Sequence, residues 1–323
     1  MKLLGTREVY GDTLAELGGI NIDIVVLDAD LSSSTRTGVF AKKFPDRFFN
    51  MGVSEADMMG TAAGLASAGK IPFASTFAIF ASGRAWEQIR QSIAYPRLNV
   101  KIVATHGGIT VGEDGASHQS VEDIAIMRVI PNMTVIVPCD GIETRGVIQD
   151  IVKYNGPVYV RVARAKFPVI MPDDYKFEIG KGVVLRDGKD AAVIANGLMV
   201  SHALDAAGIL EKEGLSVMVI NMSTIKPLDR DLISKAGRIT GAVVTAEEHS
   251  VIGGLGEAVA AVLAEECPVP MKRVGIQDRF GQSGLAEELL LHYGLMPSDI
   301  AEAVRAVISK KQGSKAKAGK CRE

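Results

Sequence analysis

The chain has 323 residues, more than a single hydrophobic core usually supports, which favours two domains. Its 36 Lys and Arg against 38 Asp and Glu exclude the basic excess that is typical of nucleic-acid-binding domains. No apolar run approaches the roughly 18 residues of a membrane span, and the first residues lack the apolar segment of a signal peptide. We therefore expect a cytoplasmic protein that binds neither nucleic acid nor membrane.

The three cysteines, Cys139, Cys267 and Cys321, lie far apart and show no metal-ligand spacing. Such scattered cysteines fit the reducing cytoplasm better than a disulfide framework. Cys139 follows an apolar run and is expected to be a small core residue, whereas Cys321 belongs to a polar C-terminal segment.

The first half of the chain alternates short apolar runs with longer helical patterns. In chain order we expect a helix over 7–17, a strand over 24–27, helices over 56–68 and 84–94, a strand over 100–104, a helix over 121–129, a strand over 135–137, a helix over 141–154 and a strand over 158–162. The strand patterns are almost continuously apolar and rich in β-branched residues. Strands of this kind that alternate with helices predict a parallel sheet covered on both faces.

A polar stretch, MPDDYKFEIGKG, interrupts this alternation near residues 171–182. The pattern then restarts with strands over 191–195, 216–220 and 242–247 and helices over 200–213 and 255–266. The fold class expected is therefore α/β, with two domains that are each a mainly parallel sheet flanked by helices, over residues 1–172 and 183–310. Residues 311–323 are basic and poor in apolar side chains, which predicts a disordered tail.

Glu55 stands at the start of a helical pattern made of Ala, Gly, Met and Ser, in FFNMGVSEADMMGTAAGLASAG. A carboxylate that enters such an apolar site loses hydration and can hold or share a proton. On the local sequence alone the simpler interpretation comes first: Glu55 and Asp57 are helix-start carboxylates, which the helix dipole favours. Further on, Phe77 and Phe80 in STFAIF could form one face for a flat ring, although such a pair is more often part of a core.

The most informative segment is the histidine loop, residues 105–122, with the sequence THGGITVGEDGASHQSVE. It follows a strand, and open α/β sheets bind ligands at the carboxyl ends of their strands. A connection this long with this many titratable groups indicates function rather than a surface turn. His106 and His118 could donate to hydroxyls or phosphate, and either could shuttle protons near neutrality. Zinc is a weaker interpretation, because no third ligand stands at a familiar spacing.

Taken together, GVSEADMMGTAAGLASAG, STFAIF, THGGITVGEDGASHQSVED and RVIPNMTVIVPCD resemble the pyrimidine-binding domain of transketolase, over roughly residues 5–170. The region beyond residue 180 is similar to the C-terminal domain of that family, with weaker motifs. The resemblance implies a transferase that moves a two-carbon ketol unit between ketose and aldose phosphates with thiamine diphosphate.

The resemblance also implies residue roles. Glu55 matches the glutamate that hydrogen-bonds the aminopyrimidine of thiamine diphosphate, and Asp30 matches an acid near the cofactor. Phe77 and Phe80 match the aromatic pocket around the pyrimidine ring. His118 matches a histidine beside the reacting carbonyl, so Glu55 and His118 are the expected catalytic residues.

For the substrate, Asp114 matches the acid that reads a sugar hydroxyl. Arg7, Ser34, His106 and Arg164 match the groups that hold the sugar phosphate, and such cations and donors suit a phosphate dianion. Without the motif context, Arg7 and Arg164 would be interpreted as surface charges.

The family's other half holds the cofactor's diphosphate through a metal, with a Gly-Asp-Gly motif and a later Asn pair. This chain has EDG at residues 113–115, inside the histidine loop, and no Asn pair follows it. The resemblance therefore implies a split enzyme: an N-terminal partner subunit supplies the diphosphate clamp and its Mg or Ca, this chain holds no metal, and the chain alone is inactive. We also expect self-association within a heterotetramer.

The second domain contributes no expected chemistry. Glu247, Glu248 and His249 are interpreted as interface or structural groups. Alternatives that share the fold are a subunit of 1-deoxyxylulose-5-phosphate synthase and the β subunit of a 2-oxo-acid dehydrogenase. A non-catalytic remnant that serves as an interaction protein is the alternative from another class.

Overall fold

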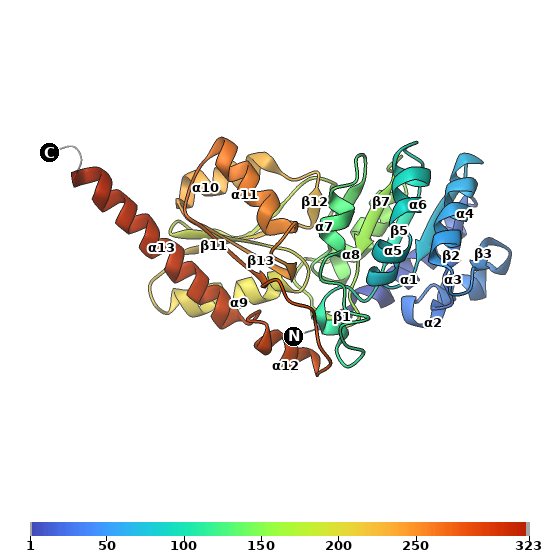
Figure 1. Cartoon of the computed structure of the whole chain (residues 1–323), viewed down its shortest axis with the longest axis horizontal. Coiled ribbons are helices and arrows are strands. Elements are labelled where there is room, and N and C mark those ends of the chain that lie inside the picture. The colour runs from blue at the N-terminus through green and yellow to red at the C-terminus, as the bar shows by residue number, and fades with distance from the viewer. Residues whose placement is uncertain (1, 321–323) are drawn as a thin grey trace.

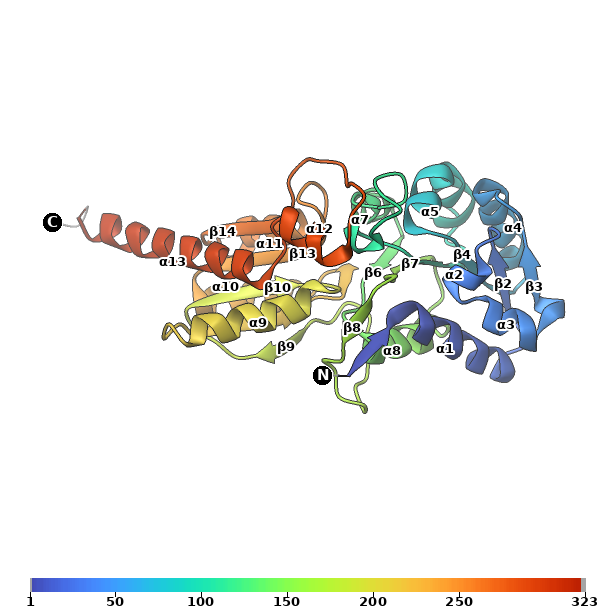
Figure 2. The same cartoon turned by 90° about the horizontal axis from the view of Figure 1, so that it is seen from below.

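In a computed structural model, residues 2–320 of the chain are described, with side chains from 2 to 313. Two α/β domains lie next to each other along the long axis, and helix α13 (Pro297–Lys320) projects from the second domain (Figure 1). Each domain has its own mainly parallel sheet with helices on both faces, as Figure 2 shows from a second direction. The predicted fold class is therefore confirmed.

The first sheet has seven strands in the order β12-β6-β7-β5-β4-β2-β3. These strands are β12 (Thr224–Lys226), β6 (Thr134–Ile136), β7 (Val158–Arg161), β5 (Lys101–Ala104), β4 (Ile71–Ser75), β2 (Ile24–Asp28) and β3 (Phe48–Asn50). All neighbours are parallel except β12, which runs antiparallel to β6. Since the six parallel strands share one direction, their carboxyl ends form one edge of the sheet.

Successive residues of a strand point to opposite faces, and both faces of the first sheet are buried. Val26 of β2 packs with α1 (Thr6–Ile20), α3 (Gly38–Lys43) and α8 (Gly141–Ile151). The next residue, Leu27, packs on the other side with α4 (Glu55–Ser67), α5 (Ala78–Arg84) and α7 (Asp123–Arg128). This two-sided burial explains why these strands are almost continuously apolar.

The second sheet has the order β14-β13-β10-β11-β9. Its strands are β14 (Met271–Ile276), β13 (Val243–Ser250), β10 (Ala191–Ala195), β11 (Val217–Asn221) and β9 (Val183–Arg186), of which only β9 is antiparallel to its neighbour. One face is covered by α9 (Met199–Glu211) and α13, and the other by α10 (Arg230–Thr240) and α11 (Leu255–Glu266). A single apolar cluster runs from Leu27 through Ile220 to Val259, so the two domains share a continuous core.

The remaining elements are short. They are β1 (Leu3–Gly5), which pairs antiparallel with β8 (Lys166–Pro168), together with α2 (Ser32–Thr35), η1 (Pro45–Arg47), η3 (Ile109–Val111) and α12 (Ala286–His292). The helix expected over 84–94 is divided: α5 ends at Arg84, α6 covers Trp86–Gln88, and a π-helical turn covers Ile89–Ala94. Strand β4 was not expected from the sequence.

The disordered tail expected from residue 311 stays a prediction. In the structure, helix α13 covers Pro297–Lys320. Seven of residues 311–320 are Lys, Ala or Gln, which favour a helix, whereas Gly313 and Gly319 oppose it. Cys321 and the last two residues lie outside the described residues. Within residues 2–320, no helix combines the length and apolar character needed to cross a membrane.

Candidate functional site

The carboxyl edge of the first sheet gathers polar and aromatic side chains from four neighbouring strands. Asp30 follows β2, Phe77 follows β4, His106 follows β5 and Arg164 follows β7. Because β2, β4, β5 and β7 are consecutive in the sheet, segments far apart in sequence converge here. Most of the residues predicted from the sequence lie at this edge.

One part of the edge is cationic. Arg7, the second residue of α1, donates from Nη1 to the backbone carbonyl of Ser34 at 3.0 Å and lies 3.4 Å from His106 Nε2. His106 Nδ1 lies 2.8 Å from the Thr105 hydroxyl. Since an arginine can only donate, Nε2 accepts and Nδ1 carries the proton of a neutral ring. The Ser34 hydroxyl takes no part in these contacts.

The imidazole of His106 is held neutral. Its side chain is 3% exposed, and burial, followed by the charges of Arg7 and Arg164, lowers its pKa to about 3. A ring with so low a pKa stays uncharged near neutrality, which suits His106 to hydrogen bonding rather than to proton transfer. A ring that stays uncharged between two guanidinium groups marks a place of strong positive potential, which is suited to an anion.

The aromatic residues connect the two histidines. The ring of Phe77 stacks on His106 with centroids 3.8 Å apart, and it lies parallel to Phe80 at 5.7 Å. His118 meets Phe80 edge to face at 5.4 Å, and its Nδ1 lies 3.0 Å from the Ser117 hydroxyl. Because His106 covers a face of Phe77, the ring is 7% exposed, while Phe80 and His118 are half-buried.

Glu55 is the first residue of α4 and is 4% exposed. Its Oε1 accepts a hydrogen bond from Arg84 Nη1 at 3.0 Å. The same guanidinium lies 4.0 Å from the centre of the Phe80 ring, so Arg84 connects the carboxylate to the aromatic group. Sequence reasoning missed Arg84, although its position four residues after Phe80 places both on one face of α5.

The tip of the histidine loop approaches the end of β7. Arg164 Nη1 lies 3.6 Å from Asp114 Oδ2 and also donates to the backbone carbonyl of Val111. Both side chains are more than a third exposed. Their polar atoms therefore stay accessible beside the buried His106.

Asp30 stands apart from this group. It has a positive φ of 63°, is exposed, and accepts from Asn50 Nδ2 at 2.9 Å. The buried acid at the end of β2 is instead Asp28, which accepts hydrogen bonds from the hydroxyls of Thr35 and Thr37. Asp28 organises the turn, and burial raises its pKa.

Comparisons with known proteins agree with this arrangement. Residues 2–169 match the family described as transketolase, pyrimidine binding domain, and residues 180–300 match transketolase, C-terminal domain. The chain belongs to the transketolase family. It corresponds to the C-terminal section of a split transketolase, with the pyrimidine-binding domain before the C-terminal domain.

Relatives of similar length support this placement in the transketolase family. A putative transketolase C-terminal section from Methanocaldococcus jannaschii is 55% identical, over 95% of this chain and 97% of the relative. One subunit of an apulose-4-phosphate transketolase from Phocaeicola vulgatus is 40% identical, over 95% of this chain and 99% of the relative. A solved structure described as a split gene transketolase, inactive β4 tetramer, is 55% identical, covers 95% of this chain and 99% of its own, and has a TM-score of 0.90.

The pyrimidine-binding domain implies thiamine diphosphate, and the residues present suit its pyrimidine end. A flat heteroaromatic ring needs an apolar face and a carboxylate to bind its ring nitrogen. Phe80 and Phe77 offer parallel rings, and Glu55 offers a carboxylate joined to Phe80 through Arg84. Among the described residues, no group of three or more His, Cys, Asp or Glu side chains converges as a metal site.

Proposed function

We propose that this chain is the C-terminal subunit of a split transketolase that, together with an N-terminal subunit, transfers a two-carbon ketol unit between ketose and aldose phosphates. The observation that carries the proposal is the cationic part of the edge around His106. Arg7 and Arg164 both act on a histidine that burial keeps neutral, beside the aromatic group of Phe77 and Phe80. A phosphate-binding end and a ring-binding end thus adjoin, as a sugar phosphate reacting on thiamine diphosphate requires.

The residue roles at the cofactor end follow from chemistry and position. Glu55 binds the pyrimidine ring nitrogen and so favours the protonation state that activates the cofactor, while Phe77 and Phe80 form the apolar wall. The resemblance also implies Asp30 as an acid near the cofactor, although it stands apart from this group and accepts from Asn50. Thiamine diphosphate supplies the carbon that takes up the ketol unit.

At the substrate end, Arg7, Ser34, His106 and Arg164 hold the sugar phosphate. Asp114 binds a sugar hydroxyl, and its salt bridge to Arg164 keeps the two exposed side chains together. His118 is the remaining acid–base group beside the reacting carbonyl, because His106 stays neutral at physiological pH.

The partner subunit holds the diphosphate of the cofactor through Mg or Ca. Support comes from relatives called subunit or C-terminal section, of which this chain covers 95–99%. A close solved relative is described as an inactive β4 tetramer, which supports both self-association and inactivity of the isolated chain. We therefore propose a heterotetramer in the cytoplasm. The two domains of this subunit are proposed to span residues 1–172 and 183–310.

The test mixes this chain with its N-terminal partner, thiamine diphosphate and magnesium. We expect transfer from xylulose 5-phosphate to ribose 5-phosphate in the mixture and none from either subunit alone. Equal activity from this chain alone, or no ketol transfer from any ketose phosphate or sulfonate donor in the mixture, would overturn the proposal. A sulfonate donor belongs in the panel because a 44% identical relative from Clostridium is a 6-deoxy-6-sulfo-D-fructose transketolase subunit.

The same mixture tests the alternatives. Pyruvate with glyceraldehyde 3-phosphate reports 1-deoxyxylulose-5-phosphate synthase activity, and a 2-oxo acid with an artificial electron acceptor reports a dehydrogenase subunit. An assembled complex that binds the cofactor yet turns over none of these substrates would identify a non-catalytic remnant.

A further inference from the structure

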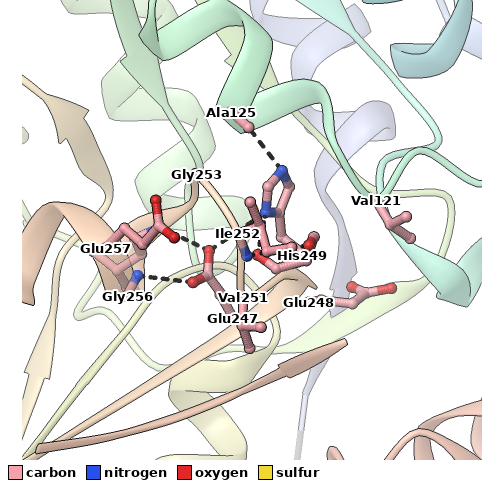
Figure 3. Close-up of polar contacts among 12 residues, drawn as sticks. Val121, Ala125, Glu247, Glu248, His249, Val251, Ile252, Gly253, Gly256 and Glu257 are labelled. Atoms are coloured by element: carbon pink, nitrogen blue, oxygen red, sulfur yellow. Dashed lines mark hydrogen bonds and ion pairs between the residues drawn. The ribbon is translucent and has the colours of Figure 1, made fainter. Parts of the chain in front are cut away.

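The histidine loop belongs to the pyrimidine-binding domain, yet the C-terminal domain contacts it at its entrance, its tip and its exit. The contacts come from the end of β13 and from residues 277–285, which connect β14 to α12. Helix α12 contacts η3 in the loop, and Figure 3 shows His249 of β13 joined by a dashed line to Ala125, with Glu248 below Val121.

At the entrance, the loop rests on Glu248. Its Oε1 accepts a hydrogen bond from the backbone N–H of Thr110 at 2.7 Å, and the side chain is 4% exposed. A Cβ at Gly108 would lie 2.2 Å from the same oxygen, so only glycine allows the loop this close. Arg161 compensates the buried charge and donates from Nη2 to the carbonyls of Glu248 and Ser120.

At the tip, the loop is tied by Gln119, the residue that follows His118. Its Nε2 lies within hydrogen-bonding distance of three carbonyls: Gly112 at 3.0 Å, Ile109 at 3.3 Å and Gln282 of the C-terminal domain at 2.9 Å. Close by, the Ser283 hydroxyl donates to the carbonyl of Glu113 at 2.6 Å. Asp114 follows Glu113 and His118 precedes Gln119, so two of the proposed substrate-site residues lie between these attachments.

At the exit, the backbone of β13 itself pairs with the loop. Ser250 N–H donates to the carbonyl of Val121 at 2.7 Å. His249, fully buried, accepts at Nε2 from the N–H of Ala125 at 3.3 Å, and its Nδ1 lies 2.7 Å from the Ser250 carbonyl. Three successive residues of one strand thus contact the loop or the helix that follows it.

We propose that the C-terminal domain is a positioning element of the active site, in which Glu248 and the Gln119–Gln282 contact hold the histidine loop so that His118 and Asp114 face the substrate. This inference rests on the proposed function for its catalytic consequence, but the holding of the loop does not depend on it. Glu247 is also buried but does not hold the loop, because its carboxylate accepts from the backbone N–H groups of Leu255 and Gly256 at the start of α11.

A substitution at Gly281 can disturb the loop without changing any residue of the proposed substrate site. A Cβ there would lie 1.8 Å from Gln119 Oε1 and 2.9 Å from its Cδ, and Gly281 lies outside the positive-φ region. Gly281→Ala therefore fits its own backbone and displaces the amide that ties the loop. Gly208→Ala in α9 is the matched control, because a Cβ there meets no atom within 4 Å.

Both variants are compared with wild type in the full chain by hydrogen exchange of residues 105–122, and in the reconstituted complex by kinetics. We expect Gly281→Ala to increase exchange in the loop and to lower kcat about tenfold with KM for the ketose within about twofold, because misplaced groups cost rate rather than binding. Gly208→Ala should match wild type in both measurements.

The double variant Gln119→Ala/Gly281→Ala tests whether the effect passes through the amide. Relative to Gln119→Ala alone, the added alanine should change kcat less than twofold, as expected for residues that act through one contact. Unchanged exchange and kcat in Gly281→Ala would overturn the inference, as would a further tenfold loss in the double variant. If the wild-type complex shows no ketol transfer, the proposed function fails, while the exchange result still decides whether the C-terminal domain holds the loop.

Discussion

The two parallel sheets of this chain end very differently at their carboxyl edges. In the pyrimidine-binding domain, Asp30, Asp114, His118 and Arg164 are exposed or half-buried. At the corresponding edge of the C-terminal domain, Asn196, Asn221, Glu247, Glu248 and His249 stand at the ends of β10, β11 and β13, and none of these five is more than 4% exposed. The first edge is open to a small molecule, whereas the second is covered by protein where β10, β11 and β13 end.

The covering protein is the first domain itself. Asn221 donates from Nδ2 to Glu143 of α8 at 2.8 Å, and Glu248 accepts from Thr110 in the histidine loop. At the carboxyl ends of parallel strands, backbone groups lack a strand partner and polar side chains gather, whether a ligand or another domain binds there. Titratable groups at such an edge therefore indicate a binding surface, and only their exposure shows whether a ligand or another domain binds there.

Among substitutions that distinguish the two edges, Glu55→Ala is expected to have the largest effect. Glu55→Ala should lower kcat of the complex about 10³-fold, within the range for loss of an acid–base contact, while assembly and folding stay intact. Steady-state kinetics and gel filtration measure the two properties. Asp57→Ala, an acid in the first turn of the same helix, should keep wild-type activity. A similar loss in both variants would contradict the role of Glu55.

A substitution that breaks contacts at the covered edge should instead lower the free energy of unfolding. Arg161 is 5% exposed and donates from Nη2 to the carbonyl of Glu248 at the covered edge at 2.9 Å, and it pairs through Nε with Asp123 Oδ2 at 3.2 Å. Arg161→Met leaves Asp123 as an uncompensated buried charge and should lower the free energy of unfolding by about 3 kcal/mol.

Denaturant unfolding of the isolated chain measures this change. Arg145→Met serves as the control, because Arg145 pairs with Glu16 on the surface and such pairs contribute little. If both variants unfold at the wild-type denaturant concentration, the second edge is not held as described.

Arg164, three residues after Arg161, lies on the open edge and should behave in the opposite way. Arg164→Met should leave the free energy of unfolding unchanged and lower kcat/KM for sugar phosphates about 100-fold, because a charge-assisted contact to phosphate is lost. Arg164→Lys should recover only part of this loss, since lysine lacks the planar fork. Equal kcat/KM in wild type and Arg164→Met would remove Arg164 from the substrate site.

The amino edge of the first sheet offers a smaller, pH-dependent contrast. Lys101 is fully buried and donates to the carbonyls of Tyr154 and Gly156 at 2.7 and 2.8 Å, and burial lowers its pKa to about 7. From pH 7 up to the unfolded pKa near 10.5, the unfolded chain holds a proton that the folded chain has released. The stability that Lys101 contributes therefore rises with pH across this window.

Between pH 7 and 9 the wild-type chain should gain about 2 kcal/mol of unfolding free energy relative to Lys101→Met. Denaturant unfolding at several pH values measures the difference. Lys70→Met, on the surface beside Asp23, should keep the wild-type pH dependence. Parallel curves for wild type and Lys101→Met would contradict the lowered pKa.

Much of the fold was predictable because continuous apolar runs and helical periods are local signals. The strands around Val26, Val103, Val160 and Ile194 were predicted within one or two residues of their ends. Strand β4 was missed because Pro72 lies within it, and proline usually argues against a central strand. The π-helical turn after Gln88 was equally hidden, since it keeps a helical appearance in the sequence.

The site was less predictable than the fold. The resemblance named residues at strand ends, and the structure brings Arg7, His106, Phe77, Phe80 and His118 together. It could not reveal Arg84 on Glu55, because that contact depends on how α4 and α5 pack. Nor could it show Gln119 or Glu248 holding the loop, since their partners are backbone groups far away in sequence.

Strand β12 has a consequence for any attempt to treat the two domains as modules. Residues Thr224–Lys226 follow the linker in sequence, yet they form the edge strand of the first sheet, paired with β6. Separate expression of the halves cut within 171–182 would strip that strand from β6 and leave an open sheet edge prone to aggregation. A chimera with another family member's C-terminal half would likewise inherit a foreign edge strand and a foreign support for its histidine loop. Recombination in this subunit therefore has no neutral crossover point at the apparent linker.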